Sequence, residues 1–84
     1  MHFDDYQRYD ALGLADLVRR GEVHPSELLD AALARADATR SLNAIVMRLD
    51  ESARQRAQAP FDTSAPFAGV PFLVKDLFQD LKGL

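Results

Sequence analysis

The sequence predicts an α/β fold in which helices precede and separate two short strands. Apolar residues recur at helical spacing over residues 11–20 and 25–40. A run rich in apolar residues follows at 44–49, and a second run, bounded by glycine and proline, occupies 70–74. The order helix, helix, strand, helix, strand belongs to the α/β class. Because two strands do not make a stable sheet alone, further strands are expected to complete it.

The first helix is predicted over residues 11–20 from its two ends and its apolar stripe. Asp10 is a suitable N-cap, and Gly21 is placed to stop the helix. Two arginines lie in the last turn, where cations are favoured. The stripe that should face the core consists of Ala11, Leu14, Ala15 and Val18.

The second helix is expected to begin at His24, with Pro25 at its first position and Glu27 reaching back to the cap. Its apolar stripe consists of Leu28, Leu29, Ala32, Leu33 and Ala36. After a break at residues 41–43, the first strand is predicted over 44–49. Asp50 should then cap a weaker helix over 51–59. A loop leads to the second strand, at 70–74, where Pro71 favours the start of the strand or an edge position.

Length and composition limit the classes of protein to consider. The 84 residues suffice for one small domain, and the net charge of −3 argues against a nucleic-acid-binding surface, which is normally basic. There is no cysteine, so disulfide and thiol chemistry are excluded. The first residues are acidic and lack an apolar run, unlike a signal peptide or a membrane span. A soluble, cytoplasmic protein without a membrane partner is therefore expected.

Most polar residues have ordinary structural explanations. His2 and His24 lack metal-ligand spacing, and no motif for a metal or a cofactor is present. None of the serines lies on a nucleophile elbow, since all are at expected caps, breaks or loops: Ser26, Ser41, Ser52 and Ser64. Lys75 stands apart because it directly follows an apolar strand segment.

Two interpretations of Lys75 follow from the residues alone. In the first, the side chain ends its strand and reaches solvent or pairs with Asp76. In the second, a dry site lowers the pKa of Lys75, so that the amine acts as a base. A free lysine is neutral in only about one molecule in 2,500 at pH 7, whereas burial lowers its pKa by about 3–5 units. A lysine base therefore needs a larger enclosed core than 84 residues supply.

Residues 69–76 resemble the lysine-bearing strand of the amidase signature family. Upstream, residues 42–46 resemble the family's first strand. A similarity to the family's first two helices is found in residues 17–23 followed by Pro25, Glu27 and Leu28. Residues 66–71 are similar to members that act on oligomeric or linear amides, including the aminohexanoate cyclic-dimer hydrolases. The three elements in register make the resemblance fairly specific.

The resemblance implies that residues 1–84 form the N-terminal portion of a single amidase signature domain. The expected content is the N-terminal helices plus the first two strands of the family's mixed sheet. Family members use a serine–cis-serine–lysine triad and an acyl-enzyme, and Lys75 matches the triad lysine. Asp76 matches the following aspartate, with an expected structural role. The two triad serines of the family lie downstream of the positions present here.

The implied activity is hydrolysis of a carbon–nitrogen amide bond in a small-molecule substrate, without a cofactor. The 84 residues alone are expected to be inactive. One alternative is the same portion of a glutamyl-tRNA amidotransferase A subunit, which a glutamine pocket or a partner-subunit gene would identify. The other is a non-enzymatic module that associates through its helices, including as a homo-oligomer. Whether the 84-residue chain folds alone as a monomer would distinguish this alternative from the others.

Overall fold

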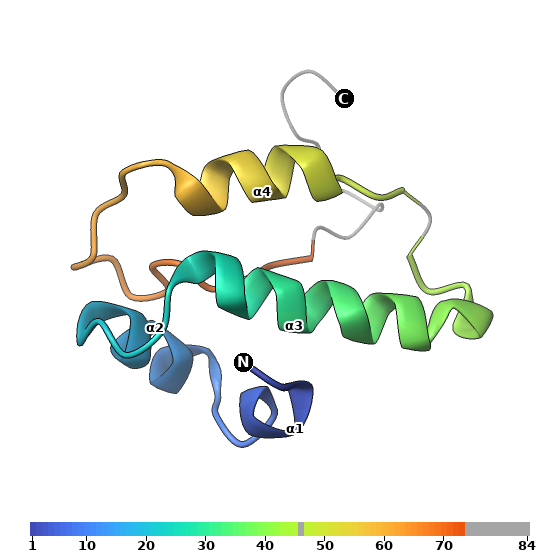
Figure 1. Ribbon diagram of the computed structural model, residues 1–84, viewed down its shortest axis with the longest axis horizontal. Coiled ribbons are helices and arrows are strands. Elements are labelled where there is room, and N and C mark those ends of the chain that lie inside the picture. The colour runs from blue at the N-terminus through green and yellow to red at the C-terminus, as the bar shows by residue number, and fades with distance from the viewer. Residues whose placement is uncertain (46, 74–84) are drawn as a thin grey trace.

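Helix α3 (Pro25–Ala38) is the central element of the fold. The computed structural model describes residues 1–45 and 47–73. Around α3 lie α1 (Phe3–Tyr6), α2 (Ala11–Arg19), the short 3-10 helix η1 (Arg40–Leu42) and α4 (Asp50–Gln58). Figure 1 shows α4 running antiparallel to α3 along one side, with α1 and α2 on the other. Helix α3 contacts both α1 and α4, and so joins the two halves of the structure.

The predicted starts of the first two helices are confirmed. The side chain of Asp10 accepts a hydrogen bond from the Gly13 amide at 2.7 Å, as an N-cap should. At the start of α3, the His24 ring accepts from the Ser26 amide at 3.1 Å. The Glu27 carboxylate accepts from the His24 amide at 3.2 Å, which completes the predicted capping box. These contacts satisfy amide groups that have no partner within the helix.

The end of α2 is a Schellman motif centred on Gly21. Gly21 has φ +76°, in the left-handed region where glycine is favoured. Its amide donates to the Val18 carbonyl and the Glu22 amide donates to the Leu17 carbonyl, each at 3.0 Å. This confirms the predicted stop and turns the chain toward α3.

The core lies where α2 meets α3. It consists of Leu14, Leu17 and Val18 from α2 and Leu28 from α3. Leu28 is fully buried, and burial of one such side chain contributes about 1.5–3 kcal/mol. Partly buried residues from four other positions pack against this cluster: Met1, Tyr6, Val23 and Val70. The core therefore draws on the N-terminus and on the segment after α4 as well as on the two helices.

The predicted apolar stripes are confirmed in part: Leu14, Ala15, Val18, Leu28 and Leu29 are buried. In α2, Ala11 is exposed and Leu17 is buried. In α3, Leu28 and Leu29 are buried together with Ala31, whereas the predicted stripe residues Ala32, Leu33 and Ala36 are only half-buried. A helix with neighbours on two sides buries a wider band than one stripe supplies.

The short helix α1 was not predicted. Its Phe3 and Tyr6 rings stack with centroids 5.4 Å apart, and the Arg35 guanidinium lies 5.2 Å from the Phe3 centroid. This cation–π contact joins α1 to α3. Partial burial of Tyr6 raises the pKa of its phenol. Helix α1 is held by a contact between its aromatic residues and an arginine 29 or more positions away, which local sequence patterns do not indicate.

The α/β prediction is wrong, because no residue among 1–45 and 47–73 forms a strand. Residues 44–45 and 47–49 instead connect η1 to α4, and residues 70–73 have no regular structure. Their side chains are not enclosed by a second layer: Met47, Phe72 and Leu73 are 63%, 82% and 75% exposed. A strand forms only where a neighbouring strand pairs with its backbone N–H and C=O groups. Among the described residues, the two predicted strands do not pair with each other.

The predicted helix after Asp50 is confirmed with a different start. Asp50 is the first residue of α4, and Leu49 occupies the cap position without a side-chain hydrogen bond. The Asp50 carboxylate is engaged by Arg48 instead. A competing ion pair therefore removes the cap that the sequence predicted.

Candidate functional site

The candidate site is the segment that leads to Lys75. Lys75 and Asp76 themselves lie outside the described residues, as does the end of the predicted second strand. Residues 66–73 are described and show how this segment is attached to the helices. In Figure 1 the segment lies beside the joint between α2 and α3.

Three consecutive residues of this segment are seated on the helices. Ala68 is buried, and Val70 packs against the α2–α3 core. Between them, Gly69 has φ +78°. A Cβ added at Gly69 would lie 2.9 Å from Pro25 Cγ and 3.1 and 3.2 Å from the two methyl groups of Val18. The backbone thus approaches both helices more closely than a side chain would permit.

Backbone hydrogen bonds shape the turn before Lys75. The Val70 amide donates to the Phe67 carbonyl at 3.1 Å, and the Ala68 amide donates to the Ala65 carbonyl at 3.2 Å. Further upstream, Arg19 Nε on α2 donates to the Thr63 carbonyl at 3.0 Å. The loop after α4 is therefore tied to α2 by an arginine as well as by apolar packing.

Asp62 stabilises the first part of the same loop. Its carboxylate accepts from the Ser64 amide at 2.9 Å and from the Ser64 hydroxyl at 2.6 Å. These hydrogen bonds favour the charged carboxylate and lower the pKa of Asp62. Ser64 is thus a turn residue here, which agrees with its predicted place in a loop.

A shallow pocket of about 270 Å³ opens beside the α2–α3 joint, with His24, Glu27 and Phe61 in its wall. The Ser26 hydroxyl lies 2.8 Å from His24 Nδ1, a distance at which a histidine base could take a serine proton. The same nitrogen also accepts a hydrogen bond from the Ser26 amide at 3.1 Å. The Glu27 carboxylate accepts a hydrogen bond from the His24 amide, and its Oε2 lies 3.8 Å from the N-terminal ammonium of Met1. This arrangement is a helix cap, and its polar groups stabilise the start of α3.

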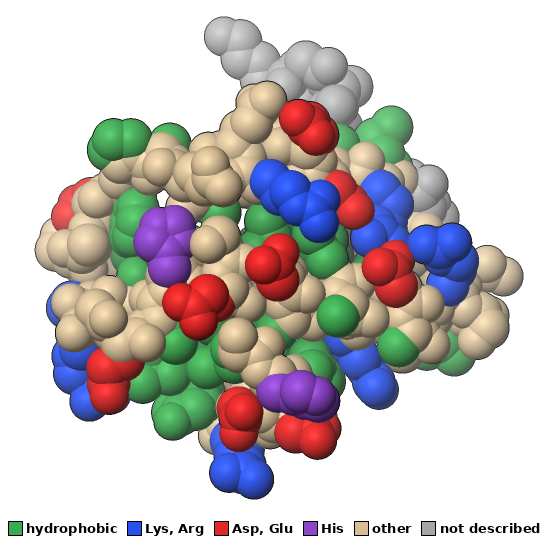
Figure 2. Space-filling view, viewed as in Figure 1, with side chains coloured by type: hydrophobic (Ala, Val, Ile, Leu, Met, Phe, Trp, Pro, Cys, Tyr) green, Lys and Arg blue, Asp and Glu red, His purple; other side chains and the backbone are tan. Residues whose placement is uncertain are grey.

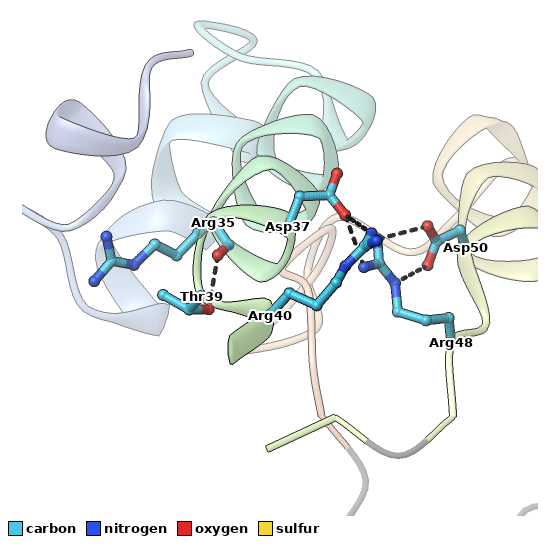
Figure 3. A network of polar contacts seen from close by, with 6 residues as sticks. All are labelled: Arg35, Asp37, Thr39, Arg40, Arg48 and Asp50. Carbon is cyan, nitrogen blue, oxygen red and sulfur yellow. Dashed lines mark hydrogen bonds and ion pairs between the residues drawn. The ribbon is translucent and has the colours of Figure 1, made fainter. Parts of the chain in front are cut away.

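A second polar cluster joins α3 to α4 (Figure 3). Arg48 donates to Asp37 at 2.9 Å and to the two carboxylate oxygens of Asp50 at 3.0 and 2.8 Å. Arg40 also donates to Asp37, at 3.0 Å. The hydrogen bonds from Arg48 lower the pKa of both carboxyl groups, and the carboxylates raise the pKa of Arg48. This cluster was not predicted from the sequence, because Arg48 lies in a predicted strand and Asp37 lies 11 residues before it.

The cluster of Arg40, Arg48, Asp37 and Asp50 has the chemistry of a cross-link between helices. Each arginine already has a carboxylate partner, so neither presents an uncompensated charge to a ligand. On the face seen in Figure 2, acidic and basic side chains are likewise interspersed. Over the described ranges, no group of three acidic, histidine or cysteine side chains is arranged to hold a metal ion. No helix among the same residues is long and apolar enough to cross a membrane.

Comparisons with known proteins show where similar sequences occur. The chain is 46% identical over 82 residues to a lipoamidase of Enterococcus faecalis, a match that covers 94% of this chain and 11% of that protein. It is 45% identical over 69 residues to a 6-aminohexanoate-cyclic-dimer hydrolase of Paenarthrobacter ureafaciens, covering 81% and 13%. It is also 45% identical over 71 residues to a glutamyl-tRNA(Gln) amidotransferase A subunit of Deinococcus radiodurans, covering 79% and 14%.

The chain spans only 11–15% of the length of the curated relatives it matches. No family model matches the chain. No solved structure matches it significantly. The relatives nevertheless agree with the resemblance seen in the sequence, and their similarity extends along most of these residues at 40–46% identity. These matches fit the resemblance to a fragment of the amidase signature family.

Proposed function

We propose that this chain is part of an enzyme that hydrolyses a carbon–nitrogen amide bond in a small-molecule substrate. The observation that carries the proposal is the similarity to curated relatives named as a lipoamidase and as 6-aminohexanoate-cyclic-dimer hydrolases. The match to the lipoamidase covers 94% of the 84 residues, so it leaves fewer residues unmatched than the nine that follow Lys75. The segment that carries Lys75 is therefore inside the region of similarity.

In the proposed mechanism, Lys75 is the proton acceptor of a serine–serine–lysine triad. The neutral amine takes a proton from a bridging serine, which in turn takes the proton of a nucleophilic serine. That oxygen attacks the amide carbonyl carbon, and the acyl-enzyme forms as the carbon–nitrogen bond breaks. The proton returns to the leaving amine, and water then hydrolyses the ester. Both serines would be supplied by parts of the protein outside these 84 residues.

Substitution of Lys75 tests this role in the protein at its natural length. Lys75→Ala should lower kcat by about 10²–10⁴-fold, the usual loss when a general acid–base group is removed. Lys75→Arg should lose as much, because a guanidinium stays protonated at any working pH. Lys82→Ala is the matched control, with an expected change of less than about twofold. Equal losses at Lys75 and Lys82, or full activity without Lys75, would contradict the assignment.

The protonation state of Lys75 can be tested separately. A lysine that acts as a base must have a folded pKa below its unfolded value of about 10.4. The rate should then rise with pH as the amine loses its proton, and Lys75→Ala should abolish that rising limb. A lysine that remains charged at the pH of maximal activity would contradict the proposal.

A second candidate function is supported by the relatives named as glutamyl-tRNA(Gln) amidotransferase A subunits, which are 40–45% identical. This function shares Lys75 with the first and differs in the substrate. Ammonia released from glutamine in the presence of partner subunits would favour it, whereas turnover of a panel of simple amides without partners would favour the hydrolase. The hydrolase proposal includes no membrane or nucleic-acid partner, no cofactor and no compartment other than the cytoplasm.

A further inference from the structure

We propose that Gly69 is a positioning residue for Lys75, because it seats the segment that carries the lysine in the joint between α2 and α3. The inference rests on the proposed catalytic role of Lys75 and adds a feature of the described structure to it. Gly69 itself touches no reacting atom. It acts by deciding where the backbone leaves the helices and starts toward the lysine.

The contact geometry defines the seat. Val18 belongs to α2, Pro25 begins α3, and Gly69 lies against both, with the Cβ position 2.9 Å from Pro25 Cγ. Real Cβ atoms essentially never come this close to another heavy atom, so any side chain at position 69 must push the segment or the helices apart. Both wall residues, Val18 and Pro25, are buried in close-packed surroundings that resist their displacement. The segment is therefore the part that yields.

Neighbouring residues hold the segment in this seat. Ala68 is buried on one side, and Val70 on the other packs against the core formed by Leu14, Leu17, Val18 and Leu28. The Val70 amide also donates to the Phe67 carbonyl at 3.1 Å. A displacement at Gly69 is therefore not confined to one residue.

The distance along the chain makes the seat relevant to the lysine. Five residues separate Gly69 from Lys75, and one of them is Pro71, whose φ is fixed near −65°. Val70, the first residue of this connection, is held against the core, so a shift at Gly69 also moves the start of the path to the lysine. A displacement of about 1 Å at a catalytic group lowers the rate by about 10²-fold. Occupying the seat with a methyl group should therefore affect the chemical step more than substrate binding.

Gly21 supplies a matched control for this test. Its φ of +76° is nearly the same as the +78° of Gly69, so alanine suffers similar backbone strain at both positions. A Cβ at Gly21, however, would meet no atom within 4 Å. The difference between Gly69→Ala and Gly21→Ala thus isolates the close approach to Val18 and Pro25.

The experiment compares these variants with Lys75→Ala in the protein at its natural length, by amide hydrolysis. Gly69→Ala should lower kcat by about 10–100-fold with KM changed less than about twofold, and should shift the lysine-dependent limb of the pH–rate profile. Gly21→Ala should keep kcat within about twofold at a similar loss of thermal stability. Pro25→Ala removes the nearest wall atom, so kcat of Gly69→Ala with Pro25→Ala should exceed that of Gly69→Ala alone.

The outcomes separate the two proposals. If Lys75→Ala loses activity and Gly69→Ala matches Gly21→Ala in kcat and pH profile, the positioning role is overturned and the proposed function stands. If Lys75→Ala keeps activity, the proposed role of Lys75 fails and the role of Gly69 fails with it. If the unsubstituted protein hydrolyses no amide, the proposed function itself fails. Should Gly69→Ala not fold, Pro25→Ala alone decides, since loosening the wall should lower kcat and leave KM unchanged. An unchanged kcat in that variant would overturn the inference.

Discussion

Asp10 fixes the first turn of α2 through one short hydrogen bond, 2.7 Å from the Gly13 amide. Asp10→Ala should lower the local free energy of opening of α2 by about 0.5–2 kcal/mol, because an amide at the helix start loses its acceptor. Amide hydrogen exchange of α2 in the protein at its natural length measures this quantity. Asp16→Ala is the control. Asp16 only pairs with Arg19 and Arg20 on the exposed surface, so its loss should cost about 0–1 kcal/mol. Equal effects at the two aspartates would exclude a capping role for Asp10.

Leu28 tests the core at the same scale, because this side chain of α3 has no exposed surface and packs in the cluster formed with α2. Leu28→Ala should destabilise the protein by about 2–5 kcal/mol through lost burial and a residual cavity. Thermal or chemical unfolding measures the loss. Leu12→Ala removes the same atoms from a side chain that is 59% exposed, and should cost far less. A small effect at Leu28 would show that the α2–α3 contact does not stabilise the fold.

Helices α3 and α4 are held together by the ion pairs of Arg48 with Asp37 and Asp50, and this contact should depend on pH. The two carboxyl groups have pKa values lowered in the fold by hydrogen bonds from Arg48. Their contribution is therefore fully present above the ordinary aspartate pKa of about 3.9 and is lost as pH falls through the lowered values. Arg48→Ala should speed amide exchange in α4 at pH 7, and the difference from the unsubstituted protein should shrink at pH 2–3.

Arg56→Ala serves as the control for the Arg48 variant, because Arg56 lies on α4 and forms none of the ion pairs found among the described residues. It should leave both the exchange rates and their pH dependence nearly unchanged. Added salt should weaken the effect of Arg48 as well, since these side chains are partly exposed to solvent. An Arg48 effect that persists unchanged at low pH would mean that packing, rather than charge, holds the helices together.

For the whole molecule, the exposed apolar side chains predict self-association of a polypeptide made of these 84 residues. Phe72 and Leu73 are 82% and 75% exposed. Exposed apolar segments favour contacts with other chains. Light scattering should therefore show oligomers at micromolar concentration, and replacing Phe72 and Leu73 together by serine should reduce them. Leu12→Ser, at another exposed apolar site, should change association less.

The same polypeptide should hydrolyse no amide, because the proposed mechanism takes both serines from outside these residues. An amidase assay run beside the light-scattering measurement tests this. A monomer at all concentrations would contradict the association argument. Measurable turnover would contradict the proposed triad instead.

The sequence by itself determined the starts of α2 and α3, the end of α2 and the resemblance to a family. Caps depend on hydrogen bonds between residues two to five positions apart, such as Asp10 with Gly13, His24 with Glu27, and Glu22 with Leu17. Such contacts form wherever the local sequence occurs, so the pattern predicts them directly. The resemblance around Lys75 likewise resides in consecutive residues, and the curated relatives fit it.

Only the tertiary structure decided the layer architecture and the seat of the candidate site. The apolar runs at 44–49 and 70–74 have strand-like composition, but a strand needs a partner at hydrogen-bonding distance, and composition does not supply one. Arg48 pairs with Asp37 and Asp50 instead of occupying a strand position. Gly69 was expected only as a turn residue. Its close fit against Val18 and Pro25 depends on atoms 44 or more positions away, so only the folded arrangement of α2 and α3 could reveal it.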